Sequence, residues 1–281
     1  MEKISEHVFI ETEFPGVVSG VINLESGMLL IDAPFDQVNQ QTWRSKWLDW
    51  PGQKEVILVL LDPHLDRTIG ISDIAPKILA HENSVEILRN RLISGQSQDI
   101  DAGAEWPAGD LPSNLRWVSP DIIFSNTIAL HWDKTPIRIT HQPGSHSAGC
   151  WVHFDAEKVI FVGDSILVNQ PPFLAWSDID TWIEELKWLA SDQLKGYKII
   201  SGRSGVVKTK SLEKMISFLS AVKDVIEVLP GSRQNEEALD SVISKLLKML
   251  SYDKDFREIY VNRLRWGLTQ YMRRLEKNEI K

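Results

Sequence analysis

The stretch LLDPHLDRTIG (Leu60–Gly70) starts as the end of an apolar run and then becomes abruptly polar. The run before it, EVILVLL (Glu55–Leu61), is uniformly apolar and rich in β-branched residues. That pattern is typical of a strand buried on both faces in the middle of a sheet. The residues that follow it include two aspartates, a histidine and an arginine, namely Asp62, His64, Asp66 and Arg67. So much charge directly after a buried strand predicts an ionic site at the edge of a sheet.

Around this stretch the chain reads as alternating strands and helices. VVSGVIN and MLLID (Met28–Asp32) are separated by LESG, which is typical of a hairpin. Helical spacing marks residues 39–50, SVEILRNRL and DIDTWIEELKWLA, and Ser177 is the expected N-cap of the last. Strand patterns return in NTIAL, PIRIT, CWVHF, KVIFVG and YKIISG. Residues 94–114 are rich in Gly, Pro and Asp, which predicts a long irregular insertion beside a binding cleft.

The segment after Lys208 is predicted to be helical throughout. Apolar residues recur at helical spacing in two runs: Leu212, Met215, Ile216, Leu219, and then Leu239, Val242, Ile243, Leu246, Leu250. PGSRQN separates these helices, Asn235 is the expected cap of the second, and a third helix is expected from about Asp255 to Glu276. We therefore predict a division at residues 1–207 and 208–281.

Composition and charge exclude several classes of partner. The 281-residue chain has a net charge of −8, which argues against general affinity for nucleic acid or anionic membranes. No apolar run approaches the roughly 18 residues that span a bilayer, and the start resembles no signal peptide. The single cysteine, Cys150, rules out an internal disulfide and a cysteine-built zinc site. A cytoplasmic location is therefore expected.

Charge is distributed unevenly along the chain. The segment from Lys208 onward carries 15 Lys and Arg against 11 Asp and Glu, whereas the rest carries 16 against 28. A basic tail beside an acidic body is expected to dock on that body or on a second copy of the chain. The apolar stripes of the tail also need cover, so we expect a homodimer formed through the C-terminal helices.

Five polar clusters follow directly on apolar segments, in the order LIDAP, DPHLDR, PGSHSAG, GDS and GRSG. In this order and spacing the chain resembles the metallo-β-lactamase-fold superfamily over roughly residues 8–205. In that family an HxHxDH signature follows a buried strand. A histidine in a PGHT-like turn, a bridging GD aspartate and a GHG-like histidine come later. The resemblance implies an α+β fold, a four-layer αββα sandwich, here with a C-terminal helical extension.

The family's metal ligands are only partly present. At the signature positions stand Asp62, His64, Asp66 and Arg67, while His146, Asp164 and Arg203 occupy the later positions and Asp32 matches a supporting aspartate behind the site. The resemblance implies one metal site on Asp62, His64 and His146, with Asp164 as a possible fourth ligand. A second site is not expected, because arginine has no lone pair to donate. His141 is a rival of His146 that we interpret as structural, and Trp176 is the expected pocket wall.

The resemblance implies hydrolysis at a reduced, mononuclear site, with zinc preferred over iron. Asp66 would be the general base, and Arg67 and Arg203 would bind the anionic group of an ester, thioester or phosphoester. We also expect Arg203 to pair with Asp164 or Asp66, and Arg67 with a neighbouring carboxylate. Two alternatives remain. One is a metal-free pseudoenzyme that binds an anionic small molecule. The other is a mononuclear iron redox enzyme.

Overall fold

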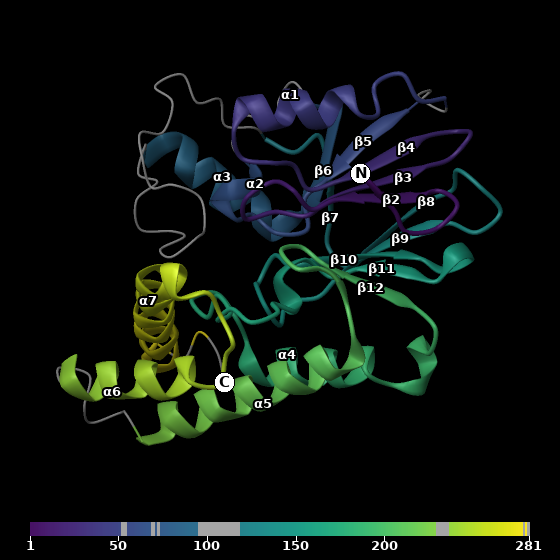
Figure 1. Ribbon diagram of the computed structural model, residues 1–281. Helices are drawn as coiled ribbons and strands as arrows, with labels where there is room; N and C mark the ends of the chain where they lie inside the picture. The colour runs from purple at the N-terminus through teal and green to yellow at the C-terminus, as the bar shows by residue number, and fades with distance from the viewer. Residues whose placement is uncertain are drawn as a thin grey trace.

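Two β-sheets face each other, and helices cover the outer face of each sheet (Figure 1). The structure is a computed structural model that describes residues 1–51, 55–68, 71, 74–94, 119–228, 236–277 and 279, with the backbone alone for 90–94 and 228. The layers run from α1 and α3 through the two sheets to α4 and α5 (Figure 1). This arrangement confirms the predicted αββα sandwich.

Within the described residues, the first sheet has its strands in the order of the chain. They are β1 (Glu2–Lys3), β2 (Val8–Glu11), β3 (Ser19–Asn23), β4 (Met28–Ile31), β5 (Val56–Val59), β6 (Lys77–His81) and β7 (Ile122–Phe124). β3 and β4 form the predicted antiparallel hairpin, whereas β4 to β7 are parallel. β5 lies between β4 and β6, which confirms its central position. The helices between these parallel strands are α1 (Gln37–Ser45), α2 (Leu65–Thr68) and α3 (Glu82–Ser94).

The second sheet contains the strands of the later half of the sandwich. In sequence order these are β8 (Thr127–Leu130), β9 (Ile137–His141), β10 (Cys150–Phe154), β11 (Val159–Phe161), β12 (Lys198–Ser201) and β13 (Gly205–Val207). β11 and β12 are parallel, and α4 (Ile179–Leu189) connects them. The cap of α4 differs from our prediction: Asp178 accepts from the backbone N–H of Thr181 at 3.0 Å, whereas Ser177 donates to the carbonyl of Leu174. The carboxylate of Asp178 reaches the first turn, so Ser177 is not the cap.

The two sheets pack through apolar side chains that alternate along their strands. Ile22, Val59, Ile139 and Val152 belong to one buried cluster between the sheets. Gly20 of β3 gives room to Phe161 of β11, because a Cβ there would lie 2.5 Å from a ring carbon. The sheets are therefore packed closely enough at this point to exclude a methyl group.

The C-terminal helices pack against α4 and against each other on the outer side of the second sheet (Figure 1). They are α5 (Thr209–Val228), α6 (Glu236–Leu247) and α7 (Arg257–Glu276). Buried side chains of all three share one hydrophobic cluster with Trp151, Ile160 and Trp182. The apolar stripes of the tail are thus covered within the chain, and the homodimer stays a prediction, as does the division at residue 208.

Some predictions fall on residues that the structure does not describe. The segment PGSRQN with the expected cap Asn235, and the insertion beyond residue 94, lie outside the described residues. Among the described helices, none combines the length and apolar character that a membrane crossing requires.

The contact between Gly20 and Phe161 can be tested with a double-mutant cycle. Gly20→Ala should lower the free energy of unfolding by about 1–3 kcal/mol, because the added methyl group overpacks the interface between the sheets. Phe161→Leu should relieve part of that cost, so the double variant should lose less stability than the two single variants added together. Denaturant unfolding measures all three. Strict additivity would contradict the packing described here.

Candidate active site

The predicted site residues lie where four strands end at the same edge of the sandwich. Asp32 follows β4, Asp62 and α2 follow β5, Asp164 follows β11, and Arg203 follows β12. The side chains of all of them are buried. Asp32 adopts a left-handed backbone, with φ of 50°, and its Oδ1 accepts from the N–H of Leu61 at 2.9 Å. This bond ties the end of β4 to the end of β5 beneath the site.

Three carboxylates and two guanidinium groups alternate through the centre of the site. Arg67 donates to Asp62 Oδ2 at 2.5 Å and also pairs with Asp164. Arg203 donates through Nε to Asp164 at 2.9 Å and through its two terminal nitrogens to Asp66 at 2.6 and 3.1 Å. The chain of charges is therefore Asp62, Arg67, Asp164, Arg203, Asp66. The expected pairings of both arginines are confirmed.

Two of these pairs, Arg67 with Asp164 and Arg203 with Asp66, cross from one sheet to the other. Arg67 and Asp66 belong to the first sheet's connections, whereas Asp164 and Arg203 follow strands of the second. Glycine makes the crossing possible at Gly202, where a Cβ would lie 2.9 Å from a terminal nitrogen of Arg67. The Gly202 carbonyl also accepts from the N–H of Val18 at 2.7 Å. The two sheets are thus joined at this edge by ion pairs and a backbone hydrogen bond.

Burial and pairing shift the acidities of this cluster in opposite directions. Burial raises the pKa of Asp32 to about 7, although Arg67 acts to lower it. Burial also acts to raise the pKa of Asp62, but Arg67 outweighs it and holds that pKa well below its ordinary value. Burial opposes ionisation of Asp164 as well, yet Arg203 and Arg67 lower its pKa. Asp62 and Asp164 are therefore ionised, and Asp32 behind them takes up a proton near neutrality.

The two predicted ligand histidines lie beside each other at one end of the charge network. His64 Nδ1 lies 2.7 Å from Asp62 Oδ1 and 3.6 Å from Asp164 Oδ2. The ring of His146 lies 5.5 Å from that of His64, measured between centroids. One ligand atom each from Asp62, His64 and Asp164 lies within 4.8 Å of the others, a grouping that could hold a metal ion. His146 adjoins this group, and its Nδ1 accepts from the N–H of Ala148 at 3.0 Å.

An aromatic ring that sequence reasoning missed forms a wall of the site. Phe173 lies under His64, with 4.8 Å between ring centroids, and under the guanidinium of Arg203 at 4.7 Å. On α7, Arg263 places its guanidinium 4.0 Å from the same ring. Arg263 is buried and donates to Gln170 Oε1 at 2.9 Å. Trp176, the expected wall, is 40% exposed and lies near Arg274 instead.

The turn that carries His146 is held by residues from both sheets. His141 stacks on His81, with ring centroids 3.7 Å apart, and its Nε2 lies 3.0 Å from the carbonyl of Ser147. Glu185 of α4 accepts from the N–H of Gly144 at 3.0 Å. Burial raises the pKa of Glu185 to about 7, although the hydrogen bond from the N–H of Gly144 acts to lower it. These contacts give His141 a structural place, as we interpreted it.

Comparison with known proteins places the fold. No protein-family model and no curated protein sequence matches the chain. Among solved structures, a metallo-β-lactamase family protein from Thermus thermophilus superposes with a TM-score of 0.68 at 14% identity, covering 97% of this chain and 94% of that one. A metallo-β-lactamase from Pontibacter korlensis gives a TM-score of 0.58 at 15% identity, covering 78% and 97%.

An inverting sec-alkylsulfatase from a Pseudomonas species is also similar, with a TM-score of 0.67 at 12% identity over 97% of this chain. The present chain spans about half of that sulfatase, 49% of its length. These likenesses show that the chain has the fold of the metallo-β-lactamase superfamily, as its motifs indicated.

Removing Arg203 should destabilise the protein. Arg203→Met leaves Asp66 and Asp164 buried without that partner, which typically costs about 3–5 kcal/mol. The matched control is Arg138→Met, which removes an exposed arginine paired with Asp155 and should cost no more than about 1 kcal/mol. Denaturant unfolding measures both variants. Equal stability of Arg203→Met and the parent would show that the network does not hold the fold.

Glu185 predicts a pH dependence of stability. Its pKa is raised in the folded state, to about 7, so the folded chain holds the proton more tightly than the unfolded chain does. The stabilisation is complete below pH 4.5 and is lost as the pH rises through 7. Glu185→Gln should therefore match the parent at pH 4 and exceed it at pH 8 by about 2–3 kcal/mol, a value discounted for partial exposure. Glu184→Gln, on the neighbouring exposed residue, is the control and should show no such change.

Proposed function

We propose that the chain is a hydrolase of the metallo-β-lactamase fold that uses at most one divalent metal ion. The observation that carries the proposal is the convergence of Asp62, His64 and Asp164, whose ligand atoms lie within 4.8 Å of one another. Two carboxylates and an imidazole suit zinc, and they also suit iron(II). His146 adjoins this group through its ring contact with His64, and we propose it as the fourth ligand.

The donor set fits such an ion because lone pairs remain on the acidic ligands. Each carboxylate oxygen has two lone pairs, and Arg67 and Arg203 each take one on the Asp164 oxygens. The ring nitrogen Nδ1 of His64 faces both Asp62 and Asp164, so a cation there would replace its proton. A divalent ion would supply Lewis acidity that activates water for attack on an ester-like bond.

The remaining charged residues have roles that follow from their contacts. Each carboxylate oxygen of Asp66 accepts one hydrogen bond from Arg203 and keeps a second lone pair. Asp66 can therefore still accept a proton as general base. The side chains of Arg67 and Arg203 are 0% exposed and engaged with carboxylates. We therefore assign them first to charge balance, in place of the second metal ion of the family.

The substrate that we propose carries an anionic group. An anionic ester, thioester or phosphoester would suit the two guanidinium groups, but its anionic oxygen would have to replace a carboxylate partner of one of them. A sulfate ester, the substrate class named for the similar sec-alkylsulfatase, has the same anionic character. A cytoplasmic location belongs to the proposal as well and is supported by the single cysteine.

One observation favours a second function, that of a non-catalytic binding protein. The five central charges already pair with one another, so each of them has an oppositely charged partner without a cation. A mononuclear iron redox enzyme has no observation of its own beyond the shared ligand set.

Metal content separates these functions. Elemental analysis of the purified protein should find about one zinc per chain. His64→Ala should abolish that content, while His131→Ala, at an exposed histidine between β8 and β9, should retain it. The chelated protein should melt at a lower temperature, because an ion that binds only the folded state stabilises it. A metal-free chain whose melting is indifferent to chelator and added zinc would favour the binding protein, and one iron per chain the redox enzyme.

The replacement of the second metal ion by arginine can be tested directly. The double variant Arg67→His, Arg203→His introduces two histidine ligands and removes two fixed positive charges. The double variant should bind a second zinc ion, measured by titration with a chromophoric chelator as competitor. Two metal ions in the parent chain would refute the assignment of the arginines, as would a double variant that gains none.

A further inference from the structure

A small cavity lies away from the charge network, where the start of α5 meets the end of α6. Its volume is about 190 Å³. The buried side chains of Leu167, Met215 and Phe218 line it, together with Leu250, and the exposed side chain of Met249 borders it. The cavity therefore combines these apolar side chains with the polar residues Asn169, Gln170 and Ser211, and it opens to solvent.

Three lysines surround this cavity: Lys208, Lys210 and Lys214. All three are exposed, and no aspartate or glutamate lines the cavity with them. Within the part of the chain that the structure describes, none of the three forms an ion pair. Three positive charges are thus gathered beside an apolar hollow with no acidic side chain to neutralise them.

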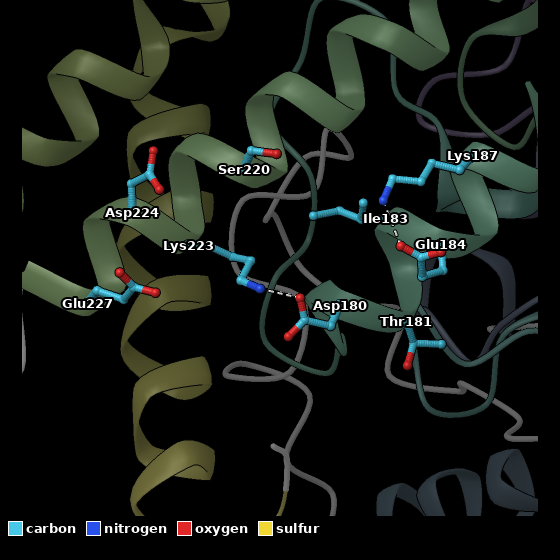
Figure 2. Close-up of a pocket in the computed structure, with 9 residues that line it drawn as sticks. All are labelled: Asp180, Thr181, Ile183, Glu184, Lys187, Ser220, Lys223, Asp224 and Glu227. Atoms are coloured by element: carbon cyan, nitrogen blue, oxygen red, sulfur yellow. Dashed lines mark hydrogen bonds and ion pairs between the residues drawn. The ribbon is translucent and has the colours of Figure 1, made fainter.

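A second hollow, which shares only α5 with this cavity, has a different lining. The groove between α4 and α5 (Figure 2) is lined by charged residues of both signs. Its two lysines are both paired: Lys223 with Asp180, and Lys187 with Glu184 at 2.7 Å. Asp224 and Glu227 add further negative charge there. That groove is an ordinary solvated surface, whereas the lysines of the apolar cavity have positive charge available for a ligand.

We infer that this cavity binds the head and chain of a small amphiphilic anion, specifically a free alkyl carboxylate of about six to ten carbons. The ammonium groups would form charge-assisted hydrogen bonds with the carboxylate, and the apolar lining would cover the chain. A water needs on the order of 10–15 Å³ of such volume, so a cavity of about 190 Å³ has room for a short alkyl chain. The inference does not depend on the chemistry proposed for the charge network.

The chain length of the ligand provides the first test. Isothermal titration of the purified protein with butyrate, hexanoate and octanoate should show binding that tightens roughly fourfold for each added methylene group. Octylammonium and 1-octanol should bind far more weakly than octanoate, because neither brings an anionic head. Equal affinities for butyrate and octanoate would overturn the inference, as would equal affinities for octanoate and octylammonium.

Variants locate the site. Lys210→Gln with Lys214→Gln should weaken octanoate binding at least tenfold. Lys134→Gln with Lys195→Gln, at exposed lysines elsewhere, changes the net charge equally and should alter binding less than twofold. Ser211→Leu fills the cavity from α5 and should abolish binding without lowering the melting temperature by more than a few degrees.

Three results would contradict the site: a tenfold loss in the control double variant, parental affinity in Ser211→Leu, or binding to anionic lipid vesicles with no binding of free octanoate. The last result would identify the lysines as a membrane-contacting patch. Metal content should be unchanged in all of these variants, so failure here is distinguishable from failure of the proposed hydrolase.

Discussion

Two buried guanidinium groups hold three carboxylates together where the two sheets meet, and the geometry of the site depends on them. Arg67 pairs with Asp62 of its own sheet and with Asp164 of the other. Arg203 pairs with Asp164 of its own sheet and with Asp66 of the other. Buried charges are costly unless each has a partner. The ends of four strands must therefore stay in register at this edge, and Gly202 keeps the space that Arg67 needs.

The same network limits the chemistry that the site can perform. Arg67 and Arg203 place fixed positive charge at the centre of the site. That charge is permanent, because guanidinium does not lose its proton at accessible pH. Asp32, with a pKa of about 7, adjusts the remaining negative charge by taking up a proton. The cluster can thus approach neutrality with one cation or with bound protons, so its charge is compatible with one bound metal ion and with a metal-free state.

The C-terminal helices are part of this arrangement. Phe173 lies between the guanidinium of Arg203 at the site and that of Arg263 on α7, so the wall of the site is supported from the helical region. α5, α6 and α7 also share a hydrophobic cluster with the second sheet. The three lysines and the small apolar cavity lie in that same region and give it a surface character of its own, distinct from the acidic body.

The sequence by itself determined the sandwich and the place of the site. Apolar runs of strand length, each followed by a polar cluster, identify the strands whose ends carry chemistry, because alternation and burial are local properties of the chain. The arginines at positions 67 and 203, where the resemblance to the family's motifs would place histidines, are likewise visible in the sequence. Short strands such as β6 and β7 were not predicted, since a few apolar residues carry too weak a periodic signal. Only the tertiary structure decided which charges pair and what lies beside them. Arg203 and Asp66 are separated by 137 positions in the chain, so no local pattern reveals their bond. Phe173 lies three residues before Trp176, the expected wall, but the packing of this segment decides which of the two rings meets His64. Arg263 contributes through a helix that sequence reasoning assigned to a separate region. Contacts between distant segments depend on the packing of whole layers, and that packing is a property of the folded chain as a whole.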